Sequence, residues 1–119
     1  MKLIIGVTLY NSGDIVERTL GSIMSQTYKN FVCYITDDLS TDNSADIVEN
    51  FIKGDDRFHL IRNYRDKTEE IKGIIKHFKP DIIVVESLQS FISEIFLFYG
   101  FKFNCKTILI SHGISILPH

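Results

Sequence analysis

Two adjacent carboxylates, Asp37 and Asp38, follow a short apolar run at residues 31–36 and precede a pattern typical of a helix. This order places both acids at the carboxyl end of an expected strand, the edge where open α/β sheets bind ligands. A buried apolar strand does not need two acids at its tip. A nucleotide, in contrast, has ring N–H groups and ribose hydroxyls that need acceptors. The sequence therefore predicts a ligand site here, and a nucleotide suits its chemistry.

The first apolar run, residues 3–10, ends in further polar and aromatic groups, with Thr8, Tyr10 and Asn11 at its carboxyl end. If this strand lies beside the strand at 31–37, the two ends form one shallow pocket. A base such as uracil could stack on Tyr10 while Asp38 accepts a hydrogen bond from its ring N–H. Such recognition discriminates strongly, because a buried acceptor left unpaired costs about 1–3 kcal/mol.

Ser40 begins the segment that leads into the next helix, where we expect free backbone N–H groups that could hold a phosphate or a ribose oxygen. The alternative is that Ser40, Thr41 and Asp42 merely cap that helix, and for Ser40 and Asp42 alone we favour it. Asn11 is expected to cap the first helix in the same way. Asp66 with Glu69 resembles a capping box for a third helix.

Strand and helix patterns alternate along the whole chain. Strands are expected at residues 3–10, 31–37, 58–62, 81–86 and 106–111, with amphipathic or apolar helical stripes in the four intervals between them. Gly54, Pro80 and Gly100 are expected to end the second, third and fourth helices. Parallel strands joined by right-handed helical crossovers predict a three-layer α/β/α sandwich with strand order 3-2-1-4-5.

Composition limits the class of protein. The chain has 119 residues, 45% hydrophobic and 24% charged, which predicts one compact domain over residues 1–119. The net charge is −2, and the basic residues are scattered along the sequence, so we expect no surface for nucleic acid or an anionic membrane.

No apolar run approaches the ~20 residues that span a bilayer. Cys33 and Cys105 fit no metal motif and are expected to be reduced, in a cytoplasmic protein without a signal peptide.

Three blocks in the first half of the chain resemble family 2 glycosyltransferases of the GT-A type. They are residues 4–11, residues 19–28 and the segment Asp37–Asp42, which is similar to that family's Asp-Asp-Gly-Ser-x-Asp motif, with Leu39 in place of the glycine. The resemblance implies a Rossmann-like, mostly parallel sheet that binds a nucleotide-sugar, with UDP favoured. It also implies that Thr8, Tyr10 and Asp38 contact the nucleotide and that Asp37 supports the pocket.

The second half, residues 64–119, departs from that pattern, whereas residues 1–63 follow it. The family carries an Asp-x-Asp motif that binds a divalent metal after the fourth strand, and this chain has Glu86 as a single acid there. Glu86 could give one ligand to Mg²⁺ or Mn²⁺, but we expect no complete site; the alternative is an acid that faces water. We find no general base for the acceptor hydroxyl, and for His112, at the end of the fifth strand, a capping or solvent-facing role is favoured. Residues 79–113 also have a weak similarity to the first domain of GT-B glycosyltransferases.

The fourth helical stripe is rich in phenylalanine, with five of the nine phenylalanines between Phe91 and Phe103. Its apolar surface predicts self-association, unless the helix is simply buried. The competing function is a non-catalytic interaction module with a vestigial pocket. A phosphoacceptor receiver domain is excluded, because it needs its acid pair after the first strand and a lysine after the fifth.

Overall fold

The computed structural model describes residues 1–87 and 94–111 of the chain. Strands and helices alternate in the order β1 (Leu3–Leu9), α1 (Val16–Met24), β2 (Phe31–Asp37), α2 (Ser44–Phe51), β3 (Phe58–Arg62), a 3₁₀ turn η1 (Tyr64–Lys67), α3 (Thr68–Phe78), β4 (Ile82–Ser87), α4 (Glu94–Lys102) and β5 (Lys106–Ser111). Three of the strands have the predicted bounds. The other two, β1 and β4, differ from prediction by one residue at their ends.

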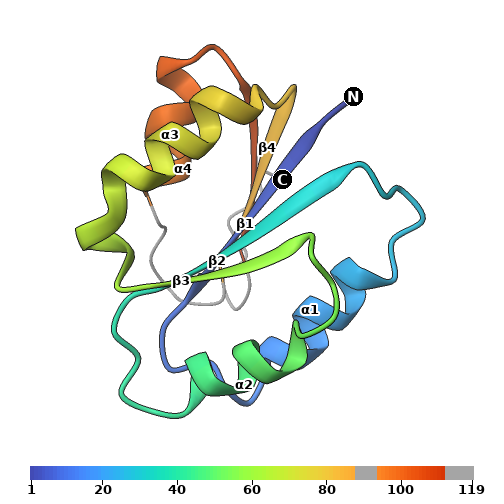
Figure 1. Ribbon diagram of the computed structural model, residues 1–119, viewed down its shortest axis with the longest axis vertical. Helices are drawn as coiled ribbons and strands as arrows, with labels where there is room; N and C mark the ends of the chain where they lie inside the picture. Colours follow the sequence, from blue (N-terminus) through green and yellow to red (C-terminus); the bar gives the residue numbers. More distant parts are fainter. Residues whose placement is uncertain (88–93, 112–119) are drawn as a thin grey trace.

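The strands form one five-stranded sheet in the order β3-β2-β1-β4-β5, and every neighbouring pair is parallel. The predicted strand order is therefore confirmed. Because β1 is the central strand, it pairs with β2 on one side and with β4 on the other. All carboxyl ends consequently lie along one edge of the sheet, the left-hand side of Figure 1.

Helices cover both faces of the sheet, which confirms the three-layer sandwich (Figure 1). Residues from α1 and α2 pack on one face, in a core of Val7, Leu9, Val16, Leu20, Ile23, Phe31, Cys33, Ile35, Val48 and Phe58. Residues from α3 and α4 pack on the other, in a core of Ile4, Ile61, Ile71, Ile75, Ile83, Val85 and Phe96. Both cysteines are free thiols, and burial raises the pKa of the Cys33 thiol.

The α4 helix lies unusually close to the sheet at two glycines. A Cβ atom on Gly6 would lie 2.8 Å from Cδ2 of Phe96, and one on Gly100 would lie 2.6 Å from Cγ2 of Thr107. Gly100 does not end the helix as predicted, because α4 continues to Lys102. It is instead the residue at which α4 approaches β5. The first part of the predicted stripe, residues 88–93, and His112 lie outside the described residues.

Helix starts are the elements that were predicted least well. The α1 helix begins at Val16 behind Ile15, α2 at Ser44 behind Asn43, and α3 at Thr68 behind Lys67, and none of these caps makes a side-chain hydrogen bond. The predicted caps at Asn11 and Ser40–Asp42 and the Asp66–Glu69 capping box are therefore wrong. The Asn11 side chain bonds to the loop before α2, and the Asp66 carboxylate accepts from Asn63 in its own turn. The Asp42 carboxylate accepts from the backbone N–H of Ser44, the first residue of α2, although Asn43 occupies the cap position. No helix within the described ranges has the length and apolar character needed to cross a bilayer.

Candidate functional site

The carboxyl ends of β1 and β2 meet at one place. Leu9 lies opposite Asp37 in the register of the two strands. One residue further on, the backbone N–H of Asp38 donates to the carbonyl of Leu9 at 3.0 Å. Tyr10 and Asp38 are therefore at the same end of the sheet, on adjacent strands. Tyr10 is 38% exposed and Asp38 is half-buried. An exposed ring beside a half-buried acid is the arrangement that stacking on a base and accepting its N–H would require.

Strand alternation separates the remaining polar groups. Thr8 and Ile4 share the face of β1 that is covered by α3 and α4, since residues two apart in a strand face the same way. Asp37 shares the α1–α2 face of β2 with Ile35. Both Thr8 and Asp37 are buried. They therefore project to opposite faces of the sheet and cannot act on one ligand atom together.

Asp37 organises the loop that follows β2. Its carboxylate accepts from the backbone N–H of Ser40 at 3.3 and 3.4 Å and from the Ser40 hydroxyl. This turn forces Leu39 into the left-handed region, at φ 58°. A glycine adopts that conformation without the clash that a Cβ makes. The structure thus gives Asp37 a supporting role in the loop and explains why a glycine is the favourable residue at position 39.

Asn11 fastens the β1–α1 loop to the β2–α2 loop. Its side-chain oxygen accepts from the backbone N–H of Thr41 at 2.8 Å and of Asp42 at 3.1 Å, and its side-chain nitrogen donates to the Thr41 hydroxyl at 3.0 Å. Its own backbone N–H donates to the Ser40 hydroxyl at 3.0 Å. Asn11 also has φ 48°, a conformation that asparagine tolerates better than most residues. It therefore clamps two loops rather than capping a helix.

These hydrogen bonds overturn one expectation about phosphate binding. The backbone N–H groups of Ser40, Thr41 and Asp42 donate within the protein, to Asp37 and Asn11. They are not free donors for a ligand phosphate, and they precede the helix instead of forming its first turn. The Asp42 carboxylate bonds to the hydroxyl and backbone N–H of Ser44, and the hydroxyl bond lowers its pKa.

Replacing Asn11 with alanine is expected to destabilise the fold by about 2 kcal/mol, because its side-chain hydrogen bonds to Thr41 and Asp42 are lost and alanine, which has a Cβ atom but no polar group, must keep a positive φ. Asn11→Gly should cost about 1 kcal/mol less, because glycine accepts that φ. Urea unfolding followed by circular dichroism measures both. Asn50→Ala, at an exposed position of α2, is the matched control and should change stability by less than about 0.5 kcal/mol. Equal stability of the Asn11→Ala variant and the parent chain would contradict the clamp.

Three residues at this edge were not predicted as functional. Ser12, Thr41 and Ser44 link the two loops, with the backbone N–H of Ser12 donating to the Ser44 hydroxyl at 2.9 Å. The signal in the sequence is the run of small polar residues after each strand, which is typical of turns that bond through their own side chains. Such a run indicates a loop but does not predict which other loop its side chains bond to.

Glu86 lies away from this loop pair. It is half-buried on β4 opposite Val7, and it lines a groove of about 360 Å³ with Leu3, Ile5, Ser22, Ile23, Gln26, Tyr28, Phe31 and Val84. A largely apolar wall does not suit a hard divalent cation, which takes oxygen ligands. No cluster of three or more His, Cys, Asp or Glu side chains that could hold a metal occurs within residues 1–87 and 94–111.

The family model described as glycosyl transferase family 2 matches residues 4–85, which include β1 through most of β4. The chain is 46% identical over 57 residues to the Escherichia coli UDP-Glc:alpha-D-GlcNAc-diphosphoundecaprenol beta-1,3-glucosyltransferase WfaP, covering 48% of this chain and 22% of that protein. It is 36% identical over 52 residues to the putative teichuronic acid biosynthesis glycosyltransferase TuaG of Bacillus subtilis, covering 44% and 21%. The chain thus spans about a fifth of the length of these relatives.

A solved structure has a similar fold. The mannosyltransferase PcManGT from Pyrobaculum calidifontis, in complex with GDP-Man and Mn²⁺, aligns with a TM-score of 0.58 at 21% identity. The alignment covers 72% of this chain and 27% of that protein. At this level of identity the comparison supports the arrangement of strands and helices and says nothing about individual side chains.

Proposed function

Because the chain belongs to glycosyl transferase family 2, we propose that it provides the donor-binding part of an enzyme that moves a sugar from a nucleoside diphosphate to an acceptor hydroxyl. The complete enzyme would invert the configuration of the anomeric carbon. The observation that carries the proposal is the Asp38-to-Leu9 backbone bond of 3.0 Å. It holds Tyr10 and Asp38 side by side at the ligand-binding edge of a parallel sheet.

Each residue has a separate part in the proposed site. Tyr10 stacks on the base, Asp38 accepts from the base, and Thr8 lines the floor of the pocket between them. Asp37, Ser40 and Asn11 hold the two loops in place and reach the nucleotide only indirectly. This division follows from their hydrogen bonds, since the Asp37 carboxylate and the Asn11 amide are already engaged with the β2–α2 loop.

The donor is proposed to carry uridine. The name of the relative WfaP specifies UDP-Glc, whereas the Pyrobaculum protein was solved with GDP-Man and Mn²⁺, so the base is a point for experiment. Use of Mg²⁺ or Mn²⁺ stays a prediction. Glu86 as described would provide a single carboxylate, and further oxygen ligands would have to come from the donor phosphates or from residues beyond those described.

Isothermal titration calorimetry of the chain against UDP, GDP, ADP and CDP tests the proposal. We expect UDP to bind with the highest affinity, because uracil offers a ring face to stack on Tyr10 and a ring N–H to donate to Asp38. Addition of Mg²⁺ or Mn²⁺ in a second series measures any metal dependence. Absence of binding to all four nucleotides would reject a donor site in this chain and favour the interaction module.

Two earlier expectations stay predictions. One is a cytoplasmic location. The other is self-association through the phenylalanine-rich helix, of which the described part runs from Glu94 to Lys102.

A further inference from the structure

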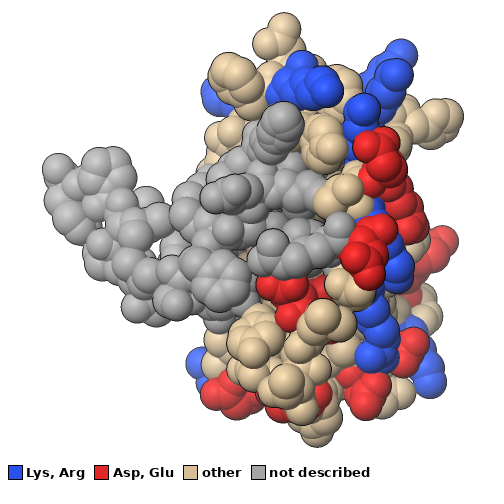
Figure 2. Space-filling view, turned by 90° about the vertical axis from the view of Figure 1, so that its left-hand side faces the viewer, with Lys and Arg blue, Asp and Glu red and all other residues tan. Residues whose placement is uncertain are grey.

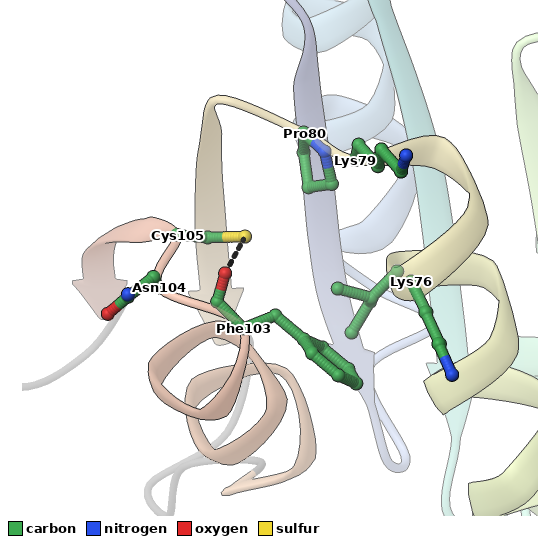
Figure 3. Close-up of a pocket in the computed structure, with 7 residues that line it drawn as sticks. Lys76, Lys79, Pro80, Phe103, Asn104 and Cys105 are labelled. Carbon is green, nitrogen blue, oxygen red and sulfur yellow. Dashed lines mark hydrogen bonds between the residues drawn. The ribbon is translucent and has the colours of Figure 1, made fainter.

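The opposite edge of the sheet carries a second surface. A groove of about 280 Å³ lies where the end of α3 meets the turn between α4 and β5, lined by Ile75, Lys76, Lys79, Pro80, Phe103, Asn104 and Cys105. In Figure 3 the Phe103 ring reaches from the end of α4 toward α3, and the amines of Lys76 and Lys79 lie at the rim. The groove therefore combines an apolar wall with cationic groups at its mouth.

More lysines surround this groove than the sequence suggested. Lys102 and Lys106 are exposed and directly adjoin the lining residues Phe103 and Cys105. Figure 2 shows several lysine or arginine side chains at the top of the molecule, the end at which α3 and α4 finish in Figure 1, and others lower down among acidic side chains. None of these four lysines forms an ion pair with a described residue. The fold thus brings lysines from distant parts of the sequence to the same end of the sheet, the end at which β4 and β5 begin.

Phe101 makes this surface unusual. It is 87% exposed, although it lies on α4 one residue before Lys102. The turn is held by backbone bonds from Asn104 to Phe101 at 3.2 Å and from Cys105 to Gly100 at 2.8 Å. These bonds hold the backbone at the end of α4, where the Phe101 side chain is exposed. A large apolar side chain is thus held in water beside a cluster of cations.

We propose that this basic surface, formed by Phe101 with Lys76, Lys79, Lys102 and Lys106, docks on an anionic lipid bilayer. Lysines attract anionic headgroups while an exposed aromatic ring enters the interface, and the two contributions together give reversible membrane binding. Contact with a second copy of this chain is disfavoured, because a two-fold interface would place the same lysines against one another. The proposal does not depend on nucleotide binding, since this surface lies at the opposite edge of the sheet from Tyr10 and Asp38.

Vesicle flotation tests the docking surface with the full 119-residue chain. We expect binding to phosphatidylcholine vesicles that contain phosphatidylglycerol, little binding to phosphatidylcholine alone, and release at high salt. A double variant with Lys76→Gln and Lys102→Gln should have an affinity for these vesicles about 25-fold lower than the parent chain, because each lysine contributes about fivefold. Phe101→Ser should weaken it as well, without loss of the fold, because the ring is not part of the core.

The matched control is the pair Lys53→Gln and Lys67→Gln, which removes the same charge from exposed positions outside the surface. This pair should float like the parent chain. The proposal is overturned if the two double variants bind anionic vesicles equally well, or if the parent chain does not bind them at all. It is also overturned if soluble glycerol phosphate competes fully with the vesicles, because the surface would then be a site for free phosphate. Binding to RNA in preference to vesicles, or Phe101-dependent dimers in light scattering without vesicle binding, would likewise overturn it.

Discussion

Replacing Asp38 with alanine is expected to weaken nucleotide binding by about 10- to 150-fold, because a hydrogen bond to a charged group contributes about 1.5–3 kcal/mol. The acid is half-buried and directly follows β2, and its backbone N–H is bonded to the carbonyl of Leu9, the residue before Tyr10. Titration calorimetry against the nucleotide that the parent chain binds best measures the loss. The nucleotide affinity of the Asp38→Asn variant should lie between those of the parent chain and of the Asp38→Ala variant, since the amide keeps one acceptor oxygen but has lost the charge.

Asp56→Ala is the matched control for this variant. Asp56 is an exposed acid in the loop before β3, at the other edge of the sheet, so its loss removes the same charge far from the proposed pocket. It should bind nucleotide like the parent chain. Equal affinities for the Asp38→Ala and Asp56→Ala variants would exclude Asp38 from the site even if nucleotide binding itself is observed. Circular dichroism of each variant checks that the fold is intact.

Replacing Phe96 with alanine is expected to destabilise the chain by about 3–5 kcal/mol. The ring is fully buried among residues of β1, α3 and β4, and it lies against Gly6, which has no side chain. The substitution therefore leaves a cavity in the core. A loss of this size approaches the whole stability of a marginal domain, which starts at about 5 kcal/mol. Urea unfolding at equilibrium gives the value. Phe96→Leu should recover much of it, because leucine fills part of the cavity.

Phe101→Ala, five residues further along the same helix, provides the internal control. Both substitutions remove the same atoms from α4, but Phe101 is 87% exposed, so its loss should change the free energy of unfolding by less than about 0.5 kcal/mol. Similar losses for the two variants would mean that α4 does not pack on the sheet through Phe96. The pair therefore separates the buried end of the phenylalanine-rich helix from the end that we propose meets lipid.

Much of the fold could be predicted from local pattern. The segments at 31–37, 58–62 and 106–111 became strands with those bounds. Each is a short run rich in β-branched or aromatic residues between turn or helix signals. The strand order followed from the alternation of strands and helices and the handedness of crossovers. Helix starts could not be predicted in this way, because the polar groups at Asn11 and Ser40 found partners on another loop about thirty residues away.

The sequence by itself determined which groups stand at the ligand edge, because the carboxyl ends of parallel strands meet there whatever the details of packing. Tyr10 and Asp38 were identified from this alone. Only the tertiary structure decided what Asp37 does. Strand alternation and the turn at Leu39 direct the Asp37 carboxylate into its own loop. The structure also decided that lysines scattered over the second half of the chain share one surface, since charge clusters depend on distances that no linear pattern records.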